Sequence, residues 1–112
     1  MNPFFRTGRN LTLAVLSLAA VAAPAFAEDT AAIVDRAVNA YNQGIDAENA
    51  GRYAEACTSY RDAADGFESA IYSLMSQPMQ TEDERENIKA YAAHLQENVD
   101  AAKANANGVC NK

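Results

Sequence analysis

The sequence predicts an all-α fold, a three-helix antiparallel bundle. Three segments after residue 27 carry apolar residues at spacings of three and four, which places them on one face of a helix. Short joints separate the segments, one at Gly51 and one after Pro78. Three amphipathic helices with short joints bury their apolar faces against one another. We therefore expect a helical hairpin with a third helix packed on it.

Residues 1–27 are expected to be a secretory signal peptide. Arg6 and Arg9 precede the apolar run 11–23, and the small residues Ala25 and Ala27 flank the cleavage point. The run is shorter than the roughly 20 residues that span a bilayer, which makes an uncleaved anchor the less favoured interpretation. We expect residues 28–112 to form a single exported helical domain without a membrane anchor, in the periplasm or outside the cell.

The acidic composition argues against two classes of partner. Cleavage removes Arg6 and Arg9, so seven of the nine Lys and Arg residues remain against 15 Asp and Glu, a net charge of −8. Nucleic acids and anionic membrane surfaces are bound through clustered Lys and Arg side chains. We expect neither kind of partner.

Cys57 and Cys110 are the two cysteines of the chain, and an exported protein enters a compartment where thiols become oxidised. We expect them to form one disulfide, because the start of the second helix and the end of the third lie at the same end of an antiparallel bundle. A metal pair and a redox pair are the alternatives. The sequence has no CxxC motif, and His94 is its single histidine, so we expect no metal and no cofactor.

The first helix is expected over about 30–50. Gly44 lies inside it, where glycine costs up to about 1 kcal/mol relative to alanine. We therefore expect Gly44 to let a neighbouring helix approach closely. The inner face is predicted to consist of Val34, Ala37, Val38, Tyr41 and Ile45.

The second helix is expected over about 52–76, between Gly51, which ends the first helix, and Pro78. Large side chains in one column should fill the core, and alanines in the next should permit close packing. These columns are Tyr53, Tyr60, Phe67 and Leu74, and Ala56, Ala63 and Ala70.

A capping box of Thr81 and Glu84 is expected to start the third helix, within an acidic run that the helix dipole favours. A calcium site is the alternative for this run, but no loop of alternating oxygen ligands with a central glycine is present. We expect the helix to stop near Asn105, before Asn107 and Gly108. Its inner face is predicted to be Ile88, Tyr91, Ala92, Leu95, Val99 and Ala102.

The joint between the first two helices resembles that of known helical modules. The small and aromatic positions of a tetratricopeptide repeat are matched in mutual spacing by Gly44, Gly51, Tyr53, Ala56, Tyr60 and Ala63. The repeat would have a larger residue at Ala40, Leu at Gln43 and Pro at Glu68. The segment 49–56 is similar to the Asn-Ala-Gly-x-Tyr-x-Glu-Ala joint of the MIT domain, a three-helix microtubule-interacting-and-trafficking module. This likeness covers about 33–103.

The resemblance implies a groove between helices that accepts a short helical or extended peptide. The usual partners of these families are intracellular, so the mode of binding alone carries over to an exported chain. The expected function is an exported small protein-interaction module that binds a peptide or a partner helix. The alternative is a structural or chaperone-like periplasmic protein with no dedicated ligand groove.

An enzyme is not expected. His94 lies outside the apolar stripe of the third helix, while Cys57 lies on the inner face of the second. Nucleophilic or acid-base chemistry needs such groups brought together in a cleft with an orienting partner. We therefore name no catalytic residue.

The outward side of the third helix is the candidate partner surface. At 100° per residue, five positions lie together opposite the predicted core stripe: Ala90, Ala93, Glu97, Ala101 and Ala104. One interpretation is that alanine, the best helix former, only strengthens a surface helix there. The other is that the ridge lets a helix from a second copy or from a different exported protein approach closely. The partner's identity is not specified by the sequence, and a homo-oligomer is one option.

Overall fold

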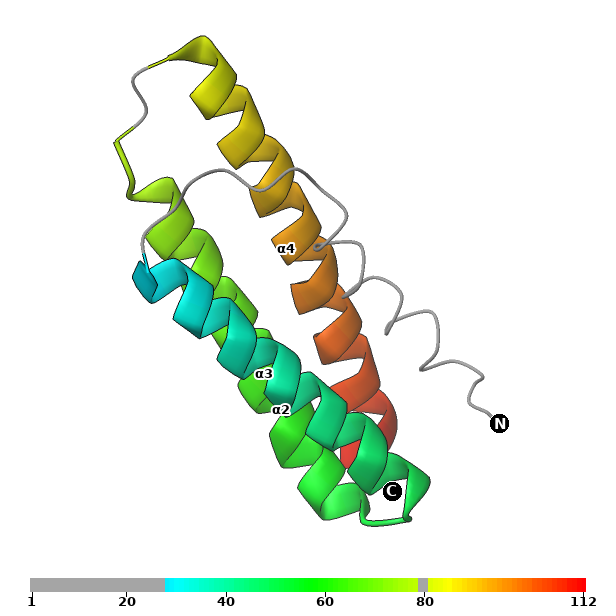
Figure 1. Ribbon diagram of the computed structural model, residues 1–112. Helices are drawn as coiled ribbons and strands as arrows, with labels where there is room; N and C mark the ends of the chain where they lie inside the picture. The colour runs from blue at the N-terminus through cyan, green and yellow to red at the C-terminus, as the bar shows by residue number, and fades with distance from the viewer. Residues whose placement is uncertain (1–27, 79–80) are drawn as a thin grey trace.

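The computed structural model describes residues 28–78 and 81–112, and these ranges contain three helices and no strand. The helices are α2 (Glu28–Asn49), α3 (Tyr53–Met75) and α4 (Glu82–Cys110). Each runs antiparallel to the one before it (Figure 1). The predicted fold class, a three-helix antiparallel bundle, is confirmed. The predicted signal peptide, 1–27, lies outside the described residues.

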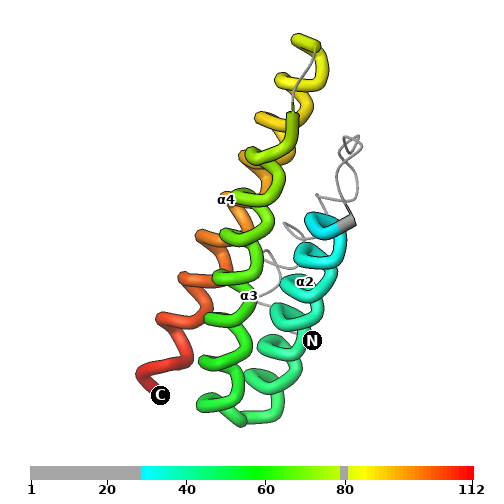
Figure 2. Tube along the Cα trace, turned by 90° about the vertical axis from the view of Figure 1, so that its left-hand side faces the viewer, coloured from blue at the N-terminus to red at the C-terminus, as the bar shows by residue number. Residues whose placement is uncertain are grey.

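The central helix of the bundle is α3. It packs along α2 on one side and along α4 on the other, whereas α2 and α4 approach each other less closely (Figure 2). The alanine column of α3, Ala56, Ala63 and Ala70, is fully buried, so both neighbours come close to its backbone. Large side chains from all three helices fill the remaining space. The largest fully buried apolar ones are Tyr41, Tyr60, Phe67, Leu74, Leu95 and Val99.

Gly51 shapes the joint between α2 and α3. Its φ of 79° lies in the left-handed region that glycine adopts without strain. The Arg52 amide donates to the Ala47 carbonyl at 2.8 Å, and the Gly51 amide donates to the Glu48 carbonyl at 3.0 Å. This pair of bonds is a Schellman motif, which satisfies the last carbonyls of α2.

The capping box predicted for the third helix is present at the start of α4. The Glu84 amide donates to Thr81 Oγ1 at 3.1 Å, and the Thr81 amide donates to Glu84 Oε1 at 3.0 Å. Two amides that lack partners within the helix are thereby satisfied.

A polar cluster links the three helices inside the bundle. The Tyr60 hydroxyl donates to Glu48 Oε1 at 2.7 Å, and Asn105 Nδ2 donates to the Tyr41 hydroxyl at 3.1 Å. The Tyr41 and Tyr60 rings meet edge to face with centroids 5.5 Å apart. Burial, with a smaller effect from the negative Glu48, raises the pKa of Tyr41. The Tyr41 phenol therefore stays protonated well above neutral pH.

The prediction that Gly44 allows close helix packing is confirmed. A Cβ at this position would lie 2.7 Å from Cδ1 and Cε1 of Tyr60. Tyr60 is fully buried and hydrogen-bonded, so its ring has little room to move. The glycine thus sets the distance between α2 and α3.

The prediction of where the third helix ends is wrong. Instead of stopping near Asn105, α4 continues through Asn107 and Gly108 to Cys110. In this extension Val109 is 2% exposed, so the last turns of the helix bury an apolar side chain. The bond from Cys110 to Cys57 holds the same turn in place.

The predicted pairing of Cys57 with Cys110 is present, with Cα atoms 4.9 Å apart. It joins the start of α3 to the last turn of α4.

The prediction that Tyr53 lies in the core column is wrong, because this residue is 37% exposed. Its ring lies instead beside the end of the chain, 5.0 Å from Lys112 Nζ.

Candidate interaction site

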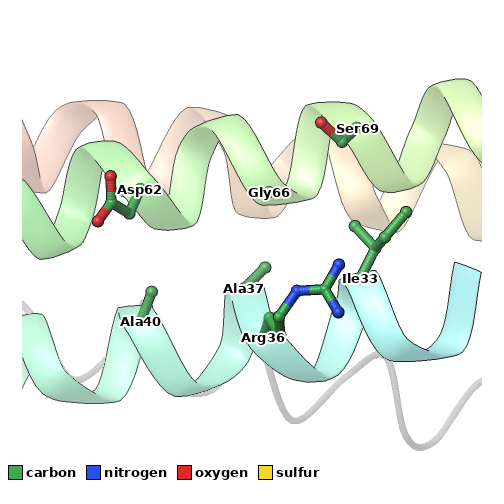
Figure 3. A pocket seen from close by; sticks show the side chains of 7 residues that line it. All are labelled: Ile33, Arg36, Ala37, Ala40, Asp62, Gly66 and Ser69. Carbon is green, nitrogen blue, oxygen red and sulfur yellow. The ribbon is translucent and has the colours of Figure 1, made fainter. Parts of the chain in front are cut away.

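A groove opens between α2 and α3 with a volume of about 440 Å³ (Figure 3). We call it the α2/α3 groove. The lining residues are Ile33, Arg36, Ala37, Ala40, Asp62, Gly66 and Ser69. The first four come from α2 and the other three from α3, so the antiparallel hairpin builds both walls.

The floor of the groove is smooth because its residues are small. Gly66 lies against Ala37, and a Cβ on Gly66 would come within 2.9 Å of the Ala37 Cβ. Ala37 is 1% exposed, while Ala40 and Gly66 are half-buried. The close approach of the two helices leaves a shallow channel without a large side chain rising from its floor.

One charge stands on each wall. Arg36 on α2 and Asp62 on α3 are both exposed (Figure 3). Within residues 28–78 and 81–112, neither side chain takes part in an ion pair. The Arg36 guanidinium on one wall can therefore donate hydrogen bonds to a binding partner, and the Asp62 carboxylate on the other wall can accept them.

Two further hollows adjoin this part of the surface. One, of about 240 Å³, lies near the joint and is lined by Gln43, Asp46, Ala47, Arg52, Glu55 and Ser59. The other, of about 400 Å³, is lined by Asp65, Glu68, Ser69 and Tyr72. It shares Ser69 with the α2/α3 groove and includes Tyr72, whose side chain is 79% exposed. The first of these hollows lies between α2 and α3, and the second lies on α3 alone.

The α4 surface predicted from the sequence is only partly outward-facing. Ala90, Ala93, Glu97 and Ala104 are exposed, but Ala101 is only 8% exposed and counts among the buried residues. The reason is local: around this position α4 buries a wider arc, which includes Asn98, Val99 and Ala102. We call the four exposed residues the α4 ridge.

The groups considered for chemistry do not come together. Cys57 is bonded to Cys110, and the side chain of His94 has Glu97 Oε1 3.8 Å from its Nδ1. In the part of the chain that the structure describes, no three His, Cys, Asp or Glu side chains are grouped to hold a metal ion. Among the same residues, no helix combines the length and the apolar character required to cross a membrane.

The resemblance implied a groove between helices, but sequence reasoning did not identify the residues that line the α2/α3 groove, although part of their signal was present. Ala37 and Ala40 recur at a spacing of three on α2, as Gly66 and Ser69 do on α3. Which of these small positions face each other depends on how the two helices are rotated, and periodicity alone does not give that rotation.

The chain was compared with known protein families, with curated proteins and with solved structures, and it matches none of them.

Proposed function

We propose that this chain is an exported helical interaction module that binds a partner helix in the α2/α3 groove. The observation that carries the proposal is the groove itself, with its floor of small residues at Ala37 and Gly66 and, on each wall, one charge that has no ion-pair partner among the described residues. A helix of small residues fits such a channel, and charged residues at its edges fix its orientation. The mode of binding would be that of tetratricopeptide or MIT modules.

Export is part of the proposal. The sequence supports it through the leader pattern of residues 1–27, and the Cys57 to Cys110 bond fits an oxidising compartment. The periplasm is the destination that we propose. The expected net charge of −8 would keep the processed protein apart from nucleic acids.

A photo-crosslinking amino acid, placed at one position at a time in the full chain, tests this function in the exporting cell. Ser69 lies on the wall of the groove and is exposed, whereas Ala93 lies on the α4 ridge and is also exposed. We expect an adduct of higher mass from position 69 and none from position 93. Adducts from position 93 alone would show that the partner binds at the α4 ridge and not in the groove.

Absence of adducts at both positions would favour the alternative of a structural or chaperone-like protein without a dedicated groove. The control is Asp46→Asn in the neighbouring hollow, which keeps side-chain size and removes a charge outside the α2/α3 groove. It should leave the crosslinking pattern unchanged.

A further inference from the structure

We infer that the partner helices in the α2/α3 groove are those of a second copy of this chain, in a twofold dimer that pairs Arg36 of each copy with Asp62 of the other. This inference rests on the proposed function of the groove and names its occupant. It begins from the opposite charges on the two walls, one from α2 and one from α3, neither paired within the described residues.

A surface that carries one positive and one negative group is complementary to itself under a twofold axis. In such an interface, if a residue contacts a second residue across the axis, the second contacts the first in return. A twofold axis that passes midway between Arg36 and Asp62 therefore forms the same ion pair twice. A surface with two like charges would instead repel its own copy.

The floor between the charges permits the close approach that these pairs need. Ala40 and Gly66 are half-buried at the floor over the buried Ala37, and none of the three carries a side chain larger than a methyl group. Two helical hairpins packed face to face at such positions would form a four-helix arrangement with interaxial distances of about 8–10 Å. At that spacing the long Arg36 side chain reaches a carboxylate on the facing helix.

The size of the surface indicates a weak dimer. A helix of 22 residues is about 33 Å long, and two packed helices present a face about 20 Å wide. The contact would cover at most about 650 Å² on each copy, below the roughly 800 Å² per partner of a standard stable interface. Two copies of net charge −8 also repel each other, but at about 0.15 M salt the Debye length is about 8 Å, which screens this long-range repulsion.

Sedimentation of protein purified from cells that express the full chain tests the inference. We expect a reversible monomer–dimer equilibrium at about 0.15 M salt. Arg36→Asp places a carboxylate opposite a carboxylate at both contacts of the dimer, and Asp62→Arg places a guanidinium opposite a guanidinium. Each single variant should dimerise at least about tenfold more weakly than the parent.

Mixing the two single variants separates a lost contact from a damaged fold. In a dimer of one R36D copy with one D62R copy, the two substituted positions face each other with opposite charges, and the other contact keeps the original pair of Arg36 and Asp62. An equimolar mixture should therefore associate as well as the parent does, and the double variant R36D/D62R should also recover the parent's association.

Three results would overturn the inference. One is that the single variants dimerise like the parent, and another is that their mixture shows no recovery. The third is a parent that stays monomeric up to about 0.5 mM, where even a weak interface of this size should associate.

The crosslinking experiment keeps the two proposals apart. An adduct of twice the chain mass from position 69 supports the dimer. Adducts at position 69 with other proteins only would refute the dimer while leaving the groove as a binding site. No adduct at position 69 would contradict both.

Discussion

Single residues decide how closely the helices of this bundle approach, and glycine does so at Gly44. We expect Gly44→Ala to destabilise the fold, because the new Cβ would lie 2.7 Å from the buried Tyr60 ring. Overpacking of this kind costs about 1–3 kcal/mol, from which up to about 1 kcal/mol is recovered by the better helix propensity of alanine. Urea unfolding at pH 7 measures the change.

Gly108 in α4 is the matched control, since no atom outside its own helix turn lies within 4 Å of a Cβ built there. Gly108→Ala should therefore raise the free energy of unfolding by up to about 1 kcal/mol. Equal effects of the two substitutions would show that the Tyr60 contact does not set the helix spacing.

The buried tyrosines predict how stability changes at high pH. Burial raises the pKa of Tyr41, and burial together with Asp35 raises the pKa of Tyr91. Above about pH 10 the unfolded chain loses these phenolic protons while the folded chain keeps them, so stability is present below that pH and falls as pH rises. Each tyrosine contributes a slope of up to about 1.4 kcal/mol per pH unit.

Tyr41→Phe should remove its share of this slope, measured by urea unfolding between about pH 9.5 and 11, the range around the ordinary tyrosine pKa. At pH 7 the variant should lose about 1 kcal/mol, because the hydrogen bond from Asn105 is gone. Tyr72→Phe, which deletes the same hydroxyl from a 79% exposed side chain, is the control. An unchanged slope in Tyr41→Phe would contradict the assignment to this phenol.

Among the elements, α4 depends most visibly on what holds its ends. Its first turns, 82–87, are exposed, so the capping box rather than packing fixes where the helix begins. Thr81→Ala should cost about 1 kcal/mol and should increase amide hydrogen exchange in the first turn of α4. The control is Thr58→Ala in α3. Thr58 is exposed and its hydroxyl donates to the Ala54 carbonyl inside the helix, so this substitution should leave stability unchanged or raise it slightly.

The other end of α4 depends on the disulfide. We expect the double variant C57S/C110S to lose up to about 4 kcal/mol, the chain-entropy value for the sequence separation of 53. Without the bridge, the helix should retreat toward Asn105, because Asn107 and Gly108 then favour a stop. Carbon chemical shifts of residues 105–110 measure that retreat. A helix that still reaches residue 110 would show that burial of Val109 suffices.

This helix end also shows where sequence reasoning stops. Periodicity predicted the three helices and most of their buried faces, since spacing along one helix is a local property. The turn at Gly51 and the capping box were equally local. The extension to Cys110, the burial of Ala101 and the exposure of Tyr53 depend on contacts between helices. The lining of the α2/α3 groove depends on helix rotation in the same way, so the resemblance implied a groove between helices while the sequence did not give its residues.

At the scale of the whole molecule, the central position of α3 makes the bundle two overlapping hairpins. The cysteine bond fastens α4 to α3 near one end, whereas α2 has no such crosslink and is held by the Gly51 turn, by side-chain packing and by the hydrogen bonds of the polar cluster. The groove proposed to bind a partner lies between the two helices that lack the covalent link. A ligand there would bridge the hairpin that is free to separate.

This arrangement has a consequence for the order in which the fold opens. With the bridge intact, α2 is the helix that can leave as a cooperative unit, so its amides should exchange through a partial opening before those of α3. Reduction would let α4 open as well. In the oxidised protein, α2 can therefore separate from the bundle, whereas α3 and α4 stay joined by the disulfide. A partner bound in the groove would contact α2 and α3 together and would stabilise the state in which α2 is packed on α3. It should slow the exchange of α2 amides by the same factor by which it stabilises that packed state.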